Sequence, residues 1–173
     1  MKTKLVVLAL ALVIAWALKS HYAAARADDL LWILTPTTRI VGVVTGADFS
    51  LQAGEGYFSR ERMFLIEKSC AGVNFMIAAF AMLVVALFHR VRSAVSAAGV
   101  LGVSLAVGYA AAVVVNAARI AVAMWLAAHP GALFIGAADV HRLEGITVYF
   151  GGLVLLYEVV QRLDRRVVIG HRS

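Results

Sequence analysis

Long apolar segments separated by short polar stretches dominate the hydrophobic pattern of the chain. Four of them, near residues 5–21, 72–88, 94–115 and 145–160, predict membrane-spanning helices, because a helix must be apolar over most of its length to cross a bilayer. The pattern therefore predicts an all-α integral membrane protein, built as a bundle of about four transmembrane helices in a single domain over 1–173.

The first apolar segment has two readings. Its core, from Leu5 to Leu18, is 14 residues long and follows two lysines, which is also typical of a signal peptide. A sequence that resembles a cleavage site follows at Ala25-Arg26-Ala27. We favour a retained span that reaches to about residue 21, with Lys19 at its interfacial end. A cleaved signal over 1–27 remains the alternative.

Two shorter apolar segments, near 30–46 and 120–128, predict interfacial or re-entrant pieces. The first contains Arg39, which argues against a full span exposed to lipid, and its Thr35-Pro36 pair is typical of a helix start. The second is either a surface helix or a continuation of the preceding span. Since each could add a crossing, the expected number of spans is four to six.

The most polar part of the chain lies at 48–68, directly before the second predicted span. It contains a turn at Ala53-Gly54-Glu55-Gly56, and apolar and polar residues alternate around it. We interpret this part as a short β-hairpin or extended loop outside the membrane.

Composition supports the membrane assignment and narrows the chemistry. The chain is 62% hydrophobic and 15% charged, against about 45–50% and 25% in ordinary globular domains. Its net charge of +6 lies in short clusters between apolar runs, so we expect no nucleic-acid partner. A single cysteine excludes an intrachain disulfide, and the five histidines lack metal-ligand spacing. We therefore expect neither a metal nor a cofactor.

The basic residues also suggest an orientation. If both termini and the loop with Arg90 and Arg92 are cytoplasmic, that side carries eight of the 16 Lys and Arg but only two of the ten acidic residues. Short basic loops close to span ends are retained in the cytoplasm. The expected topology is a multi-pass protein with both termini inside.

In this topology three chemically distinctive residues meet at the outer interface. Cys70 comes directly before the second span, Arg119 directly after the third and His141 directly before the fourth. A cysteine nucleophile, a histidine that exchanges protons and a fixed cation are the components of an acyl-transfer site. Arginine stabilises a thiolate and a developing oxyanion. We therefore take these three as candidate catalytic residues.

Three further polar residues lie near them. Asn116 precedes Arg119 by three positions, on the same face if the segment is helical. Asn74 follows Cys70 by one turn, and Asp139 is two residues before the histidine. We expect Asn74, Asn116 and Asp139 to support the site.

Non-catalytic interpretations are open for each residue. A lone cysteine is commonly an inert small hydrophobe, the arginine could be an interfacial anchor and the histidine an exposed loop residue. The main rival function is a non-enzymatic membrane subunit or small transporter, which would place charged residues along a path through the membrane. Another membrane acyltransferase or intramembrane protease would place its nucleophile deeper in the bilayer.

Three motifs resemble those of one family, the exosortases and archaeosortases, over roughly residues 50–160. They read Ser69-Cys70-Ala71-Gly72-Val73-Asn74-Phe75, Asn116-Ala117-Ala118-Arg119-Ile120 and His141-Arg142-Leu143-Glu144-Gly145. Their order, side and spacing are those of the family, and the short chain is most similar to the small exosortase K branch. One departure is the residue after the cysteine, which is serine in many members and Ala71 in this chain.

The resemblance implies a bacterial inner-membrane cysteine transpeptidase whose active site faces the periplasm or exterior. Its partner would be a membrane-anchored protein substrate with a C-terminal sorting signal: a short motif (Pro-Glu-Pro in the best-known branch), a hydrophobic helix and a basic tail. Carried over to this chain, Cys70 would be the nucleophile, Arg119 the partner of thiolate and oxyanion, and His141 the acid and base.

Overall fold

The computed structural model describes residues 2–129 and 137–170, the side chains of 137–144 and 166–170 excepted. Its main elements, in chain order, are α1 (Lys2–Ala24), α2 (Leu31–Thr45), β1 (Ser50–Gln52), β2 (Gly56–Ser59), β3 (Phe64–Ile66), α3 (Val73–Ala86), α4 (Ala94–Ala128) and α5 (Ala137–Gly170). Short 3-10 turns precede α2 (η1, Asp28–Leu30) and α3 (η2, Lys68–Cys70) and follow α3 (η3, Phe88–Arg90).

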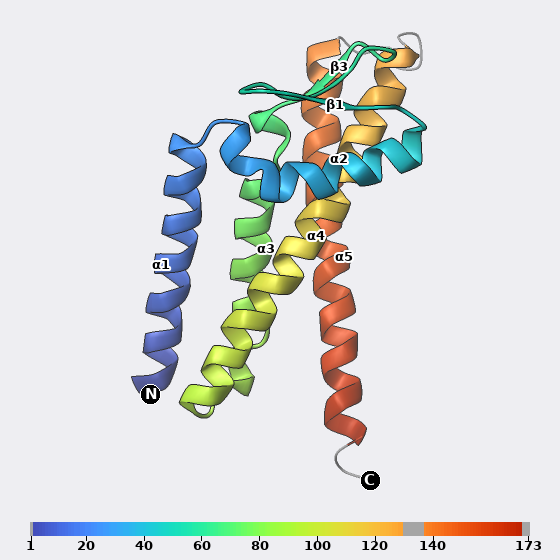
Figure 1. Ribbon diagram of the computed structural model, residues 1–173. Helices are drawn as coiled ribbons and strands as arrows, with labels where there is room; N and C mark the ends of the chain where they lie inside the picture. The colour runs from blue at the N-terminus through green and yellow to red at the C-terminus, as the bar shows by residue number, and fades with distance from the viewer. Residues whose placement is uncertain (1, 130–136, 171–173) are drawn as a thin grey trace.

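The structure is mostly helical, and four helical segments are long and apolar enough to cross a membrane: Lys2–Ala24, Lys68–Ala86, Ala94–Ala128 and Gly145–Arg165. They coincide with the four predicted spans. In Figure 1, α1, α3, α4 and α5 form one bundle, and both chain ends lie at the same end of it. We call this the terminal end, and the other the sheet end.

Helix α4 decides between the two interpretations of the segment 120–128, in favour of a continuation of the preceding span. The segment 120–128 is not a separate interfacial or re-entrant piece but the last turns of a continuous 35-residue helix. Nothing between Asn116 and Ile120 interrupts the helix, because alanine is the best helix former and no proline or glycine is present. At 1.5 Å per residue α4 is about 52 Å long, which exceeds the roughly 30 Å of a hydrocarbon core.

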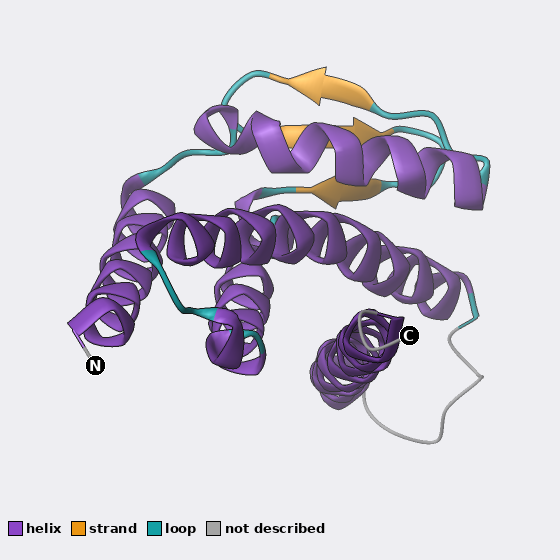
Figure 2. Ribbon diagram, turned by 90° about the horizontal axis from the view of Figure 1, so that it is seen from below, coloured by secondary structure: helices purple, strands orange, loops and turns teal. Residues whose placement is uncertain are grey.

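Helix α2 runs across the sheet end, at a steep angle to the bundle (Figure 1). It confirms the short helix predicted at 30–46, although it begins at Leu31, so that Pro36 lies inside it. Its buried residues Ile33, Leu34, Thr37, Thr38 and Val41 form a single face, as expected of an amphipathic helix on a core. Figure 2 shows α2 alongside the strands at one edge of the molecule.

The polar segment before Cys70 forms a sheet of three antiparallel strands rather than a two-stranded hairpin, so the fold is not purely α. Ser50 pairs with Phe58, and Tyr57 pairs with Ile66. The Tyr57 hydroxyl also forms a 2.8 Å hydrogen bond with Thr35, which attaches the sheet to α2. A strand of only three residues, such as β3, is too short to show a recognisable alternation of apolar and polar residues.

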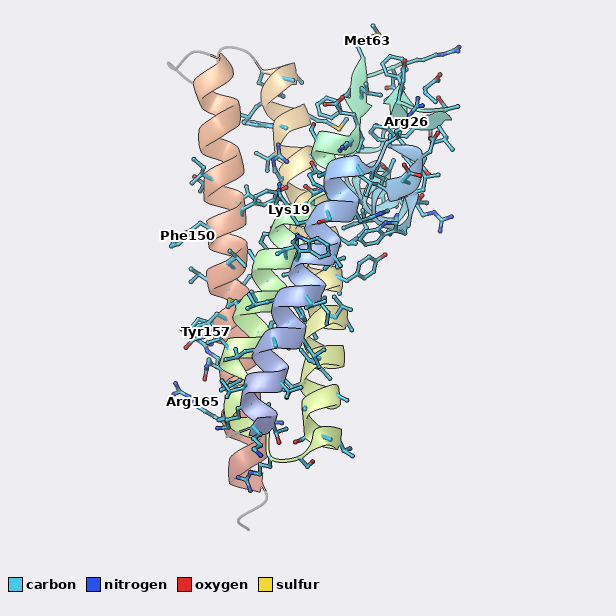
Figure 3. All side chains as sticks on the ribbon, turned by 90° about the vertical axis from the view of Figure 1, so that its left-hand side faces the viewer. Lys19, Arg26, Met63, Phe150, Tyr157 and Arg165 are labelled. Atoms are coloured by element: carbon cyan, nitrogen blue, oxygen red, sulfur yellow. The ribbon has the colours of Figure 1, made fainter. Side chains whose placement is uncertain are left out.

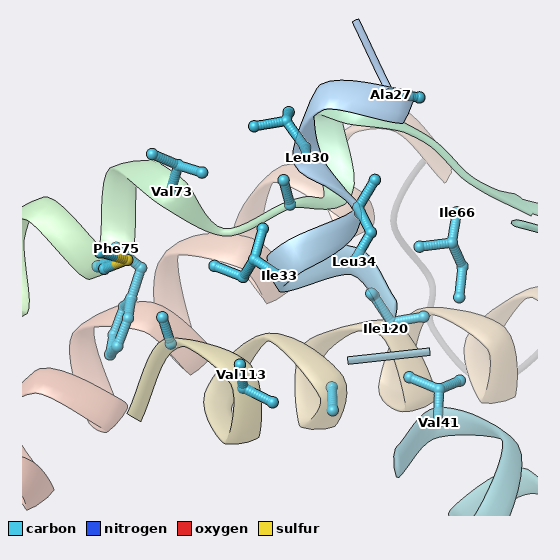
Figure 4. Close-up of a cluster of buried hydrophobic side chains, with 14 of the residues drawn as sticks. Ala27, Leu30, Ile33, Leu34, Val41, Ile66, Val73, Phe75, Val113 and Ile120 are labelled. Carbon is cyan, nitrogen blue, oxygen red and sulfur yellow. The ribbon is translucent and has the colours of Figure 1, made fainter. Parts of the chain in front are cut away.

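The main core lies beneath α2, at the sheet end (Figure 4). Ile33 and Leu34 of α2, Phe75 of α3 and Ile120 of α4 all belong to it. A second cluster joins α1, α3 and α4 nearer the terminal end and includes the fully buried Val7 and Phe80. The two clusters fix α3 and α4 as the centre of the bundle.

Helices α1 and α5 present apolar surfaces on the outside of the bundle. Leu12 and Trp16 are each 71% exposed, and Phe150 is 69% exposed. Figure 3 shows Phe150 and Tyr157 pointing away from the other helices. An apolar exterior of this kind is what a helix next to lipid requires, because lipid tails are themselves apolar.

Helix α5 is attached to the bundle at its middle and near its terminal end. At its middle Gly152 lies against Val115 of α4, and a Cβ on Gly152 would come within 2.8 Å of a Val115 methyl group. Near the terminal end the carboxylate of Asp164 contacts Arg90 and lies 3.1 Å from His89. These contacts attach α5 both to α4 and to the turn that follows α3.

Candidate active site

Cys70 is the last residue of the 3-10 turn η2, two residues before α3 begins. Gly72 lies between the cysteine turn and α3, and its φ of +69° is in the left-handed region that favours glycine. A Cβ at Gly72 would lie 2.9 Å from Cγ of Asn116. This glycine is therefore required both by the backbone conformation and by the close approach of α4.

The thiol of Cys70 is half-buried at the edge of the main core. Its Sγ lies 3.8 Å from the hydroxyl of Ser69, which donates a 2.8 Å hydrogen bond to Glu67. The thiol thus has a polar neighbour on one side and the apolar core on the other.

Asn116 connects α4 to the cysteine turn. Its side chain is fully buried, and its Nδ2 donates a hydrogen bond to the backbone carbonyl of Cys70. The structure therefore brings this predicted supporting residue directly to the candidate nucleophile, across 46 positions of sequence.

Arg119 lies one turn further along α4, and the structure brings it together with Tyr149 of α5. Its Nη1 donates a 3.1 Å hydrogen bond to the Tyr149 hydroxyl, and its guanidinium carbon is 5.2 Å from the centre of the tyrosine ring. The same hydroxyl donates a 2.8 Å hydrogen bond to Oδ1 of Asn116. Cys70, Asn116, Tyr149 and Arg119 thus form one continuous network.

Tyr149 was not predicted from the sequence, because it lies within an apolar run whose residues were all assigned to a span. A signal for it does exist. It lies eight positions after His141, which is two helical turns and hence the same helix face. That signal depends on a helix that begins before residue 145, where the predicted span started.

Position 141 lies within α5, since this helix begins at Ala137 rather than at residue 145. The side chains of His141 and Asp139 lie outside the described residues. Helical spacing places residue 141 on the α5 face that also carries Gly145 and Tyr149, both of which face the site.

A pocket of about 420 Å³ opens beside this network. It is lined by Tyr22 of α1, by Ser69, Gly72, Val73 and Asn74 around the start of α3, by Arg119 of α4 and by Gly145, Ile146 and Tyr149 of α5. Ser69 and Gly72, on both sides of the cysteine, therefore line the same space as Arg119. A substrate segment of a few residues has room there.

The α1 side of the pocket carries two further cations. The ammonium of Lys19 donates a 2.7 Å hydrogen bond to Oδ1 of Asn74, and that of Lys68 donates a 3.0 Å hydrogen bond to the Ala23 carbonyl. The Lys19 and Lys68 ammonium groups lie 5.6 Å and 5.3 Å from the centre of the Tyr22 ring. Asn74 thus lines the pocket and joins α3 to α1.

Within the part of the chain that the structure describes, no group of three or more His, Cys, Asp or Glu residues is placed to hold a metal ion. No family model, curated protein or solved structure matches the chain.

Proposed function

We propose that this protein is a membrane-embedded cysteine transpeptidase or peptidase, with Cys70 as nucleophile, Arg119 as the stabilising cation and His141 as acid and base. The observation that carries the proposal is the network in which Asn116 binds the Cys70 carbonyl and Tyr149 binds both Asn116 and Arg119, next to a pocket. The resemblance of the three sequence motifs to the exosortases and archaeosortases supports it.

The first half-reaction is an acyl transfer to sulfur. His141 takes the proton of Cys70, and the thiolate attacks a peptide carbonyl of the substrate, so that a C–S bond forms and the carbonyl π electrons move to oxygen. Arg119 stabilises this oxyanion. When the intermediate collapses, the C–N bond breaks, the protonated His141 gives its proton to the leaving amine, and a thioester on Cys70 remains.

The second half-reaction releases the acyl group. An amine of an acceptor, or water, attacks the thioester and loses a proton to His141. The C–S bond then breaks, the sulfur leaves as thiolate, and His141 returns the proton to it, which regenerates the starting thiol and neutral histidine. Transfer to an amine makes the protein a transpeptidase, and transfer to water makes it a peptidase.

The proposed substrate is an exported, membrane-anchored protein with a C-terminal sorting signal, and the proposed location is the bacterial inner membrane with the pocket facing outward. The pocket is bounded by α1 and α5, whose outer surfaces are apolar. A substrate helix that approaches through the bilayer would meet these two helices first. The short basic loop with Arg90 and Arg92, close to the span ends on the proposed cytoplasmic side, supports the orientation.

The test uses an exported reporter that ends in a Pro-Glu-Pro motif, a hydrophobic helix and a basic tail, expressed with the full-length protein. Wild type should remove the tail from the reporter, and Cys70→Ala should abolish removal while still inserting into the membrane. Ser50→Ala, an exposed hydroxyl on β1, serves as the control and should process normally. Mass spectrometry of the wild-type protein incubated with the reporter should detect a hydroxylamine-sensitive acyl group on Cys70, and the His141→Ala variant should not form it. Normal processing by Cys70→Ala would overturn the proposal.

A further inference from the structure

Tyr149 occupies the centre of the polar network and has no role in the chemistry proposed above. Its hydroxyl has two partners, Nη1 of Arg119 at 3.1 Å and Oδ1 of Asn116 at 2.8 Å. These partners come from the same helix, α4, whereas the tyrosine comes from α5. A single oxygen atom therefore joins the proposed cation to the amide that holds the cysteine turn.

The hydrogen bonds of this network can run in one direction only. A guanidinium donates and never accepts, whereas a backbone carbonyl accepts and never donates. Arg119 must therefore donate to the Tyr149 oxygen, and the tyrosine O–H must point at Asn116 Oδ1. The amide is then oriented so that its Nδ2 faces the Cys70 carbonyl, as the structure has it. Each bond fixes the orientation of the next.

The tyrosine ring itself is held firmly. It packs against Phe75 of α3, with ring centres 5.3 Å apart and planes inclined by 43°. One turn of α5 away, Gly152 allows close contact with Val115 of α4. Its hydroxyl is thus positioned by packing on two helices and does not depend on the guanidinium for its place.

From these contacts we infer that Tyr149 is a positioning residue: it sets the guanidinium of Arg119 at the mouth of the pocket, and thereby the reactivity of Cys70. The inference rests on the proposed cysteine chemistry and adds to it a residue outside the three motifs. Removal of the hydroxyl leaves the ring and its packing in place but takes one hydrogen-bond partner from Arg119 and one from Asn116.

The test measures alkylation of Cys70 by iodoacetamide at pH 7 in the purified full-length protein, which needs no knowledge of the substrate. The thiolate is the species that reacts, and a fixed cation nearby favours it. Tyr149→Phe should lower the alkylation rate about tenfold, in line with loss of a hydrogen bond to a charged group. Tyr157→Phe is the matched control, a partly exposed tyrosine two turns further along α5, and should react as wild type.

A double variant separates positioning from a general loss of structure. If Tyr149 acts through Arg119, Arg119→Gln should slow alkylation by itself, and adding Tyr149→Phe should slow it less than twofold further. Independent effects that multiply would overturn the inference. Arg119→Lys gives a second test that leaves Tyr149 in place. Lysine keeps the charge but loses the planar fork, so a wild-type rate would show that precise placement of the cation is irrelevant.

The outcomes also distinguish this inference from the proposed function. If Arg119→Gln slows alkylation and Tyr149→Phe does not, the positioning role is wrong while the cysteine chemistry stands. If neither substitution alters the rate, the pairing of Arg119 with Cys70 fails as well, and the proposed function fails with it.

Discussion

The side-chain amide of Asn116 donates a hydrogen bond to the backbone carbonyl of Cys70. The two residues belong to different helical elements, α4 and η2, and the amide is fully buried. The hydrogen bond therefore attaches the backbone of the cysteine turn to α4, the same helix that carries Arg119. Four predictions on stability and one on topology follow from this and related contacts.

Asn116→Ala should destabilise the protein by about 1–3 kcal/mol, because it leaves the Cys70 carbonyl and the Tyr149 hydroxyl without their partner. The measurement is thermal unfolding in detergent. Asn74→Ala is the matched control: Asn74 is exposed, so its loss should change stability by less than about 0.5 kcal/mol. Equal effects of the two substitutions would show that the buried network does not stabilise the fold.

Gly72→Ala should cost about 1–3 kcal/mol, since alanine is strained at a φ of +69° and its methyl group would meet Asn116. It should also slow alkylation of Cys70, because the cysteine turn must shift. Gly99→Ala is the control on α4, where a Cβ meets nothing within 4 Å; it should be neutral or slightly stabilising. Unfolding midpoints that agree for both variants would contradict this account of the turn.

The contact between α4 and α5 can be tested with two adjacent glycines. Gly152→Ala places a methyl group 2.8 Å from a branched, stiff Val115 side chain and should cost about 1–3 kcal/mol. At Gly151 a Cβ meets nothing within 4 Å, so Gly151→Ala should leave the unfolding midpoint within about 1 °C of wild type, as expected of a neutral surface change. A reversed order of the two effects would mean that α5 docks differently.

At the terminal end, Asp164→Asn should lower stability by about 1–3 kcal/mol, because it removes the charge that both Arg90 and His89 face. The Asp164 side chain is only 13% exposed, so solvent screens it weakly. Glu158→Gln is the control, since its contact with Arg162 is long, at 3.7 Å, and exposed, and such pairs contribute little. If added salt reduced the stabilising effect of Asp164 and that of Glu158 equally, the Asp164 cluster would be an ordinary surface ion pair.

The proposed orientation predicts which side of the membrane each position faces. Cys70 is the single cysteine of the chain, so a membrane-impermeant maleimide added to spheroplasts should label the wild-type protein there. In a Cys70→Ala background, a cysteine introduced at Ser93, in the loop before α4 at the other end, should be labelled only after permeabilisation. Labelling in the opposite pattern would reverse the topology.

Hydrophobic pattern alone predicted the positions of the four long helices. A helix that crosses lipid needs a continuous apolar segment, and polar residues are found only at its ends. The pattern misjudged where helices begin and end. Helix α4 continues through Asn116 and Arg119, and α5 begins eight residues before the predicted start of its span. A polar residue alone does not end a helix, as a proline or glycine can.

Chemical type predicted part of the site. Asn116 was recognised by its spacing from Arg119, and the structure places it on the cysteine turn. Tyr149 was missed, since aromatic residues within a span carry no distinguishing local pattern. Its partners lie 30 and 33 positions away, a pairing that depends on how α5 docks on α4, and one sequence does not contain that information.

Asn116, which binds the cysteine turn, and Arg119 lie one turn apart on a single long helix. The cysteine turn and the cation therefore belong to one rigid unit. Tilting of α4 carries both together and leaves their separation unchanged. Tyr149 and position 141 belong to α5, a second unit. In the proposed mechanism, a displacement of α5 from α4 would remove the positioning tyrosine and the proposed acid and base at once, and it would leave the thiol unassisted. The proposed site would then be complete only while α5 is docked, and an incoming hydrophobic helix that competes for that docking surface would act directly on reactivity.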